Sequence, residues 1–191
     1  MMQIPLTIFD EFKRSNDIYN HLKKSTGKNK YEKIMDSSEL EITYNTILEH
    51  VIPRNSIMIL IRVNDIIFGS YSSGSFQETD NYWIMKEDPK HFVFLYNTTT
   101  RKYEKFSKID SNDRNLIVQK PVKPGTKSGT FNPSLVTCYG AFTIENEFHS
   151  RRSQIDYSFE GNYDVKKGIT ADVFLKKKYF LYDNLLILHW S

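Results

Sequence analysis

Glu145, Glu147 and His149 alternate along the chain, and their types and spacing come nearest to those of a metal or catalytic site. In an extended strand alternate residues share one face, so two carboxylates and an imidazole would lie together. Such a group is typical of a metal site or of general acid–base catalysis. The alternation is equally typical of an ordinary half-buried strand, because Ile144 and Phe148 are apolar. We therefore expect no metal and no cofactor, and keep this trio as the one candidate metal site.

Other signatures of catalysis are missing from the sequence. It contains neither a lysine-containing phosphate loop nor a dinucleotide-binding glycine pattern. No serine has the context of a hydrolase nucleophile, although Ser73 and Ser75 lie in a segment where one could be argued. The single cysteine, Cys138, has no cationic sequence neighbour to activate its thiol, which predicts a small buried residue. We predict that the protein is not an enzyme, with metal-dependent or hydrolytic activity as the alternative.

Basic side chains gather in the C-terminal third and are interleaved with aromatic ones. The basic residues are Arg151, Arg152, Lys166, Lys167, Lys176, Lys177 and Lys178. Such cations could contact phosphates and the aromatic rings could stack on bases, which makes DNA binding one hypothesis. Against it, lysines often protect exposed sheet edges, and nearby acidic residues dilute the positive field. The formal net charge of +3, from 26 basic and 23 acidic residues, is also small for a dedicated nucleic-acid module.

Length and composition indicate one folded domain. The chain has 191 residues, of which 39% are hydrophobic, enough to enclose a core. The longest apolar run, 56–61, is far shorter than the roughly 20 residues of a membrane helix, so we expect no membrane insertion. The first residues lack the basic start of a secretory signal, and a lone cysteine suits a reducing compartment. We expect a cytoplasmic or nuclear protein.

The first 30 residues predict one amphipathic helix and a connector, followed by a domain at 31–191. Ile8, Phe12, Tyr19 and Leu22 recur at helical spacing, and Gly27 is a typical C-cap. The apolar stripe could dock on the domain that follows, or pair with the same helix of a second chain to form a homodimer.

The remaining pattern predicts mostly short strands. Ser38 and Glu41 form a capping-box pattern ahead of a helix at 40–51. Two β-rich runs, 56–63 and 66–71, flank Asn64 and Asp65, which predicts a hairpin. Further strands are predicted at 31–35, 82–85, 91–96, 102–106, 116–118, 135–139, 141–144, 154–159, 172–175 and 184–190, with a long exposed loop at 120–133. The fold class is therefore α+β, a two-sheet antiparallel β-sandwich with flanking helices.

Several short motifs occur in the order found in the TLDc domain family. The run from Phe68 to Ser73, followed by Phe76, resembles that family's Phe-Gly-Gly-Tyr-Thr-Ser and Trp signature, and other segments match from position 31 onward. The motif residues are Phe68, Gly69, Tyr71, Ser73, Phe76, Asp88, Gly140, Phe142, Gly161 and Tyr163. The sequence departs from the family at Phe76 and Ser70, and in the closing strand 185–188 it lacks an acidic residue.

The resemblance implies a β-sandwich flanked by helices, with no established catalytic mechanism. Family members are associated with resistance to oxidative stress and, in several eukaryotes, with binding the vacuolar proton pump. The resemblance therefore implies a non-catalytic macromolecular-interaction protein linked to the oxidative-stress response, with a protein partner. The alternative is a DNA-binding transcriptional regulator that uses the basic clusters of the C-terminal third.

Overall fold

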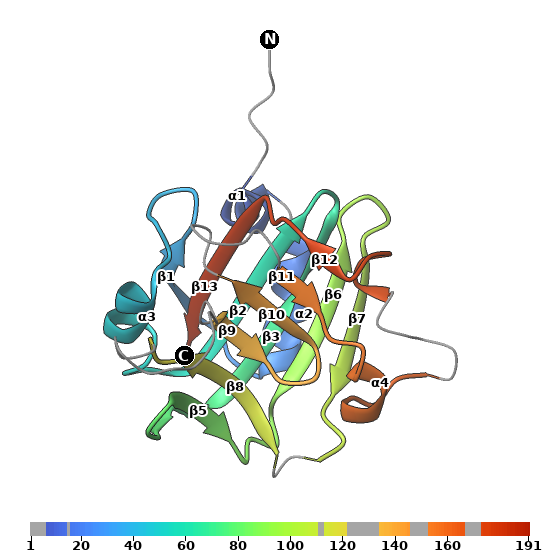
Figure 1. Ribbon diagram of the computed structural model, residues 1–191. Coiled ribbons are helices and arrows are strands. Elements are labelled where there is room, and N and C mark those ends of the chain that lie inside the picture. The colour runs from blue at the N-terminus through green and yellow to red at the C-terminus, as the bar shows by residue number, and fades with distance from the viewer. Residues whose placement is uncertain (1–6, 15, 111–112, 122–133, 146–152, 167–172) are drawn as a thin grey trace.

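Two antiparallel sheets face each other in a sandwich (Figure 1), as predicted. The computed structural model describes residues 7–14, 16–110, 113–121, 134–145, 153–166 and 173–191. The six-stranded sheet has the order β1 (Tyr31–Asp36), β13 (Asn184–Trp190), β2 (Asn55–Val63), β3 (Ile66–Ser75), β6 (Phe92–Asn97) and β7 (Lys102–Ser107). The seven-stranded sheet has the order β12 (Tyr179–Phe180), β11 (Ser153–Ile155), β10 (Phe142–Glu145), β9 (Ser134–Cys138), β8 (Arg114–Gln119), β5 (Tyr82–Lys86) and β4 (Gln77–Glu78).

The predicted hairpin at Asn64 and Asp65 joins β2 to β3 and is confirmed. Asn64 adopts a positive φ of 55°, which its short polar side chain tolerates. Gly69 of β3 lies opposite Leu60 of β2, and the strands approach so closely there that a Cβ would overlap the Ile59 carbonyl. The glycine is therefore needed for this pairing.

Aromatic rings fill the space between the sheets. Phe68 of β3 contacts Phe142, Phe174 and Phe180, with ring centroids 5.6, 5.6 and 5.4 Å apart. All four side chains are at most 2% exposed. Because Phe142 and Phe180 lie on the seven-stranded sheet, this cluster joins the two layers.

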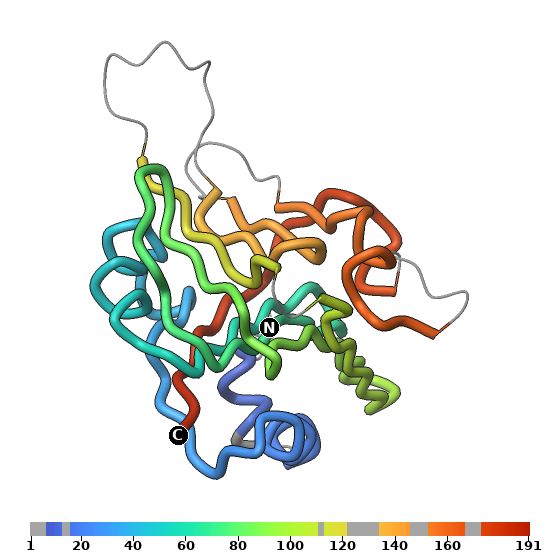
Figure 2. Tube along the Cα trace, turned by 90° about the horizontal axis from the view of Figure 1, so that it is seen from below, coloured from blue at the N-terminus to red at the C-terminus, as the bar shows by residue number. Residues whose placement is uncertain are grey.

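Two N-terminal helices cover the outer face of the six-stranded sheet. Helices α1 (Ile8–Arg14) and α2 (Asn16–Thr26), blue in Figure 2, bury Ile8, Phe12, Ile18 and Leu22 against this sheet. Tyr19 also stacks on Trp190 of β13. The apolar stripe thus docks within the chain, the first of the two arrangements that its spacing allowed. No helix in the described ranges is long and apolar enough to cross a membrane.

Several predicted helices and strands differ from those in the structure. The N-terminal region forms two helices rather than one. Helix α3 (Tyr44–His50) begins later than predicted, because Thr43 and Thr46, and not Ser38 and Glu41, form the capping box. The predicted strand 154–159 ends at Ile155, and its last residue, Phe159, begins the short helix α4 (Phe159–Asn162). The predicted strand 172–175 is not one over its described residues, where Phe174 is buried in the core.

Candidate functional site

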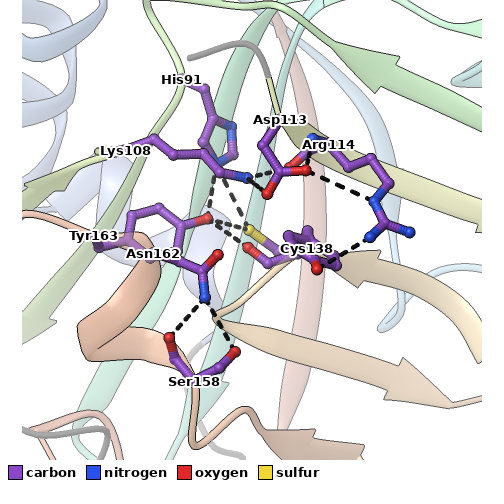
Figure 3. Close-up of polar contacts among 9 residues, drawn as sticks. His91, Lys108, Asp113, Arg114, Cys138, Ser158, Asn162 and Tyr163 are labelled. Atoms are coloured by element: carbon purple, nitrogen blue, oxygen red, sulfur yellow. Dashed lines mark hydrogen bonds and ion pairs between the residues drawn. The ribbon is translucent and has the colours of Figure 1, made fainter. Parts of the chain in front are cut away.

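His91, Cys138 and Tyr163 meet in a buried polar cluster between the sheets (Figure 3). They come from the residue preceding β6, from the end of β9 and from the residue following α4. His91 Nε2 lies 3.0 Å from the Tyr163 hydroxyl and 3.8 Å from Cys138 Sγ. His91 Nδ1 lies 2.7 Å from the Ser72 hydroxyl, and the Tyr163 hydroxyl donates to the Tyr139 carbonyl at 3.0 Å.

Burial holds this cluster in its neutral form. It lowers the pKa of His91 to about 3, and the nearby Lys108 ammonium adds to that effect. Burial likewise raises the pKa of the Cys138 thiol to about 11. A nucleophilic cysteine requires a stabilised thiolate, and a general base requires a pKa near the working pH. The cluster therefore has the residue types of a cysteine–histidine catalytic site, but it lacks the thiolate and the basic imidazole that such a site needs. Its hydrogen bonds join β3, the start of β6, β9 and the end of α4.

A second group of cations and rings lies beside the cluster. Lys108 Nζ is 5.0 Å from the Tyr139 ring centroid, and the Arg114 guanidinium carbon is 4.3 Å from the same centroid. Asp113 pairs with both, at 3.9 Å from Lys108 and 3.7 Å from Arg114. The Lys108 side chain is only 3% exposed, and burial lowers its pKa. Lys108 is far from Cys138 in the sequence, so the residues that flank the cysteine do not reveal this nearby cation.

Most of the motif residues have structural roles. Phe68 and Phe142 form the core contact described above, Tyr71 lies on the opposite, helix-covered face of β3, and Phe76 packs against the core. Phe68 and Tyr71 therefore point to opposite faces of β3.

Asp88 organises the end of β3. It is 3% exposed and accepts hydrogen bonds from the Ser73 hydroxyl at 2.6 Å, from the Ser73 and Gly74 amides, and from the Lys90 amide at 3.0 Å. Ser73 is thus committed to Asp88 and does not resemble an activated nucleophile.

The Gly140 and Tyr163 motifs come together across the chain. Gly140 has a φ of +74°, and a Cβ there would lie 2.5 Å from Asn162 Cγ. Asn162 Nδ2 donates to the Ser158 carbonyl and hydroxyl at 2.7 and 3.1 Å. Gly161 shows no such constraint, since a Cβ there would meet nothing within 4 Å.

The basic clusters are only partly placed. Lys176 and Lys177 are exposed, and Lys178 Nζ lies 5.3 Å from the Tyr157 ring centroid and 5.4 Å from that of Tyr179. The two rings are 62% and 51% exposed. We call Tyr157, Lys176, Lys177, Lys178 and Tyr179 the basic aromatic surface. Lys166 is exposed, while Arg151, Arg152 and Lys167 lie outside the described residues.

Most of the candidate metal trio lies outside the described residues. Glu145 is the last residue of β10, and Glu147 and His149 fall outside the described residues. Among the residues that the structure does describe, no three His, Cys, Asp or Glu side chains are grouped so that they could hold a metal ion.

Comparisons with known proteins add no assignment: no family model matches the chain, and no curated protein matches it.

Proposed function

We propose that this protein is a non-catalytic binding protein of the TLDc type, which contacts an acidic macromolecular partner through the basic aromatic surface. The motif resemblance suggests a role in the oxidative-stress response, a cytoplasmic or nuclear location, and a protein such as the vacuolar proton pump as partner. The observation that carries the proposal is the exposure of Tyr157 and Tyr179, both of which contact the Lys178 ammonium.

Exposed tyrosines beside cations are typical of binding surfaces. Tyrosine gives a large contact area with a polar tip, and it is enriched among the residues that dominate binding energies. Leaving two such rings more than half exposed has no benefit for folding, because their apolar surface stays in water. A partner that covers these rings would gain the free energy of removing their apolar surface from water.

The lysines supply the expected charge preference. Within the described residues, none of the ion pairs involves Lys176, Lys177 or Lys178. The nearest carboxylate in sequence to Tyr157, that of Asp156, accepts from the Ser158 amide and hydroxyl at 2.8 Å. None of these three lysines thus has an ion-pair partner among the described residues, and an acidic partner is favoured.

The neutral buried cluster supports a non-catalytic role. Its thiol stays protonated and its imidazole unprotonated at physiological pH. The side chains that would carry nucleophilic chemistry, His91, Cys138 and Tyr163, are instead hydrogen-bonded to each other inside the sandwich.

DNA is the second candidate partner, favoured by the same pair of rings. Tyrosine rings stack on unpaired bases, and neighbouring lysines contact phosphates. Binding would then weaken steeply with salt, because phosphate contacts release counterions.

One titration tests both candidates. Fluorescein-labelled poly-L-glutamate and labelled mixed-sequence DNA, single- and double-stranded, are titrated with the protein over a range of salt concentrations. A variant with Lys176, Lys177 and Lys178 changed to Glu is compared with a control in which the exposed Lys24, Lys30 and Lys90 are changed to Glu. The two variants carry the same change in net charge.

Each outcome decides between specific alternatives. We expect polyglutamate to bind, and the first variant to lose at least about tenfold in affinity while the control retains most of it. Tight, strongly salt-dependent binding of DNA alone would favour the second candidate. Absence of binding to every probe, or equal losses in the two variants, would overturn the proposal.

A further inference from the structure

Strand β12 is the last strand of the seven-stranded sheet and, among the described strands, has a neighbour on one side only. It pairs with β11, Phe180 opposite Ser153 and Tyr179 opposite Gln154. Phe180 is 2% exposed and lies in the core between the sheets, so the strand is anchored. Tyr179 of this strand belongs to the basic aromatic surface.

The backbone groups on that edge can be assigned by alternation. The Ile155 amide donates to the Lys178 carbonyl at 2.8 Å, so Lys178 turns its backbone groups toward β11. Because successive residues of an antiparallel strand face opposite neighbours, Tyr179 turns its backbone groups away from β11. In the described part of the chain, no backbone hydrogen bond beyond the sheet ladder involves Lys177, Tyr179 or Leu181. Lys177 is exposed, and Tyr179 and Leu181 are 51% and 54% exposed.

The two edges of the six-stranded sheet differ from that of β12, because one is covered at its end and the other contains a bulge. At the end of β7, the Asp164 amide donates to the Ser107 carbonyl at 2.8 Å, and Lys108 forms a bridge with Tyr163. Strand β1 carries a bulge between Lys33 and Met35. Covering segments and bulges both hinder the addition of a further strand. The edge of β12 shows neither device among the described residues.

Charge selects what can pair there. A second copy of the same edge would place its own lysines near Lys176 and Lys177, which is repulsive. An extended segment rich in glutamate or aspartate would meet the opposite charge. We propose, resting on the proposed function, that an extended acidic segment of a partner protein adds to the seven-stranded sheet as a strand beside β12.

The sheet register states where such a strand would lie. Thr143, Gln154 and Tyr179 are successive cross-strand partners and share the outer face of the sheet. A residue placed opposite Tyr179 extends this row, next to an exposed ring. The partner's backbone then bonds to the Tyr179 amide and carbonyl, while alternate side chains approach the lysines.

A backbone-specific variant pair tests the mode of binding. Tyr179→Pro removes the outward amide, and Tyr179→Ala removes the same ring but keeps the amide. Proline is tolerated at a strand edge where the amide faces solvent. The probe is a labelled peptide of alternating glutamate and valine, with a matched peptide in which the valine amides are methylated.

We expect the glutamate–valine peptide to bind the native protein and to slow amide exchange at Tyr179. Tyr179→Pro should bind the peptide about tenfold more weakly than Tyr179→Ala does. The native protein should likewise bind the methylated peptide about tenfold more weakly than the unmethylated one. The exchange measurement on the native protein does not depend on how either variant folds.

Failure of the strand mode is distinguishable from failure of the proposed function. If the peptide binds and the lysine-to-glutamate variant loses it, but the proline and alanine variants are equal and no amide is protected, the surface binds acidic chains without strand addition. If the peptide and polyglutamate both fail to bind, the proposed function fails as well.

Discussion

Replacing Gly69 by alanine probes the closest approach in the fold. Gly69 lies in the middle of β3, opposite Leu60. A Cβ there would lie 2.9 Å from the Ile59 carbonyl carbon, closer still to its oxygen, and 3.1 Å from the Leu60 Cα. These are backbone atoms of a buried strand, so no side-chain rotation can relieve the overlap.

The expected cost follows from what must move. Strands β2 and β3 would have to separate, which lengthens several hydrogen bonds of the central pairing. Overpacking a core costs about 1–3 kcal/mol when side chains can adjust, so with backbone alone to shift we expect at least about 3 kcal/mol. That is a large part of the roughly 5–15 kcal/mol by which domains are stable.

Urea unfolding followed by tryptophan fluorescence measures this cost, since Trp83 and Trp190 lie in different sheets. The matched control is Gly161→Ala, where a Cβ meets nothing within 4 Å. Because alanine is the better helix former, this change in α4 should leave stability unaltered or raise it by up to about 1 kcal/mol. A Gly69→Ala protein whose free energy of unfolding lies within about 1 kcal/mol of the native value would show that β2 and β3 can separate without this cost.

Three further experiments test the buried polar groups. Burial lowers the pKa of His91 from 6.5 to about 3, so below pH 6.5 the unfolded chain binds a proton that the native state does not. This group should therefore lower the free energy of unfolding by about 1.4 kcal/mol for each pH unit below 6.5. Between pH 7 and pH 5, the free energy of unfolding of His91→Gln should fall by about 2 kcal/mol less than that of the native protein. Equal falls of the two proteins in urea unfolding would contradict this expectation. Asp88→Asn replaces acceptors of several amides by a donor and should lower the free energy of unfolding by about 2 kcal/mol; a change below about 0.5 kcal/mol would count against this. Cys138 should react with a thiol reagent only after unfolding, because it is 0% exposed and its pKa is raised to about 11; rapid labelling of the native protein would show otherwise.

The parts of the fold that were predictable are those with local signals. The hairpin at Asn64 and Asp65 is one, since turn chemistry and strand patterning agree over neighbouring residues. The boundaries that failed depend on competition between neighbours. Thr43 outcompetes Ser38 as the helix cap, and Phe159 begins a helix because its ring packs against Phe106 and Tyr163 in the core.

The buried cluster could not be predicted from local signals. His91 and Cys138 are 47 positions apart, and His91 and Tyr163 are 72 apart. Their meeting follows from the pairing order of both sheets, which periodicity alone does not determine. The basic aromatic surface was partly predictable, because Lys178 and Tyr179 are adjacent, whereas Tyr157 reaches Lys178 only through the β11–β12 pairing.

The most direct test of the binding proposal is an NMR titration of the isotope-labelled protein with polyglutamate. We expect the amide shifts to concentrate at Tyr157 and at 176–181, and to vanish when Lys176, Lys177 and Lys178 are changed to Glu. Shifts centred elsewhere, on the helix-covered face for instance, or persisting in that variant, would contradict it.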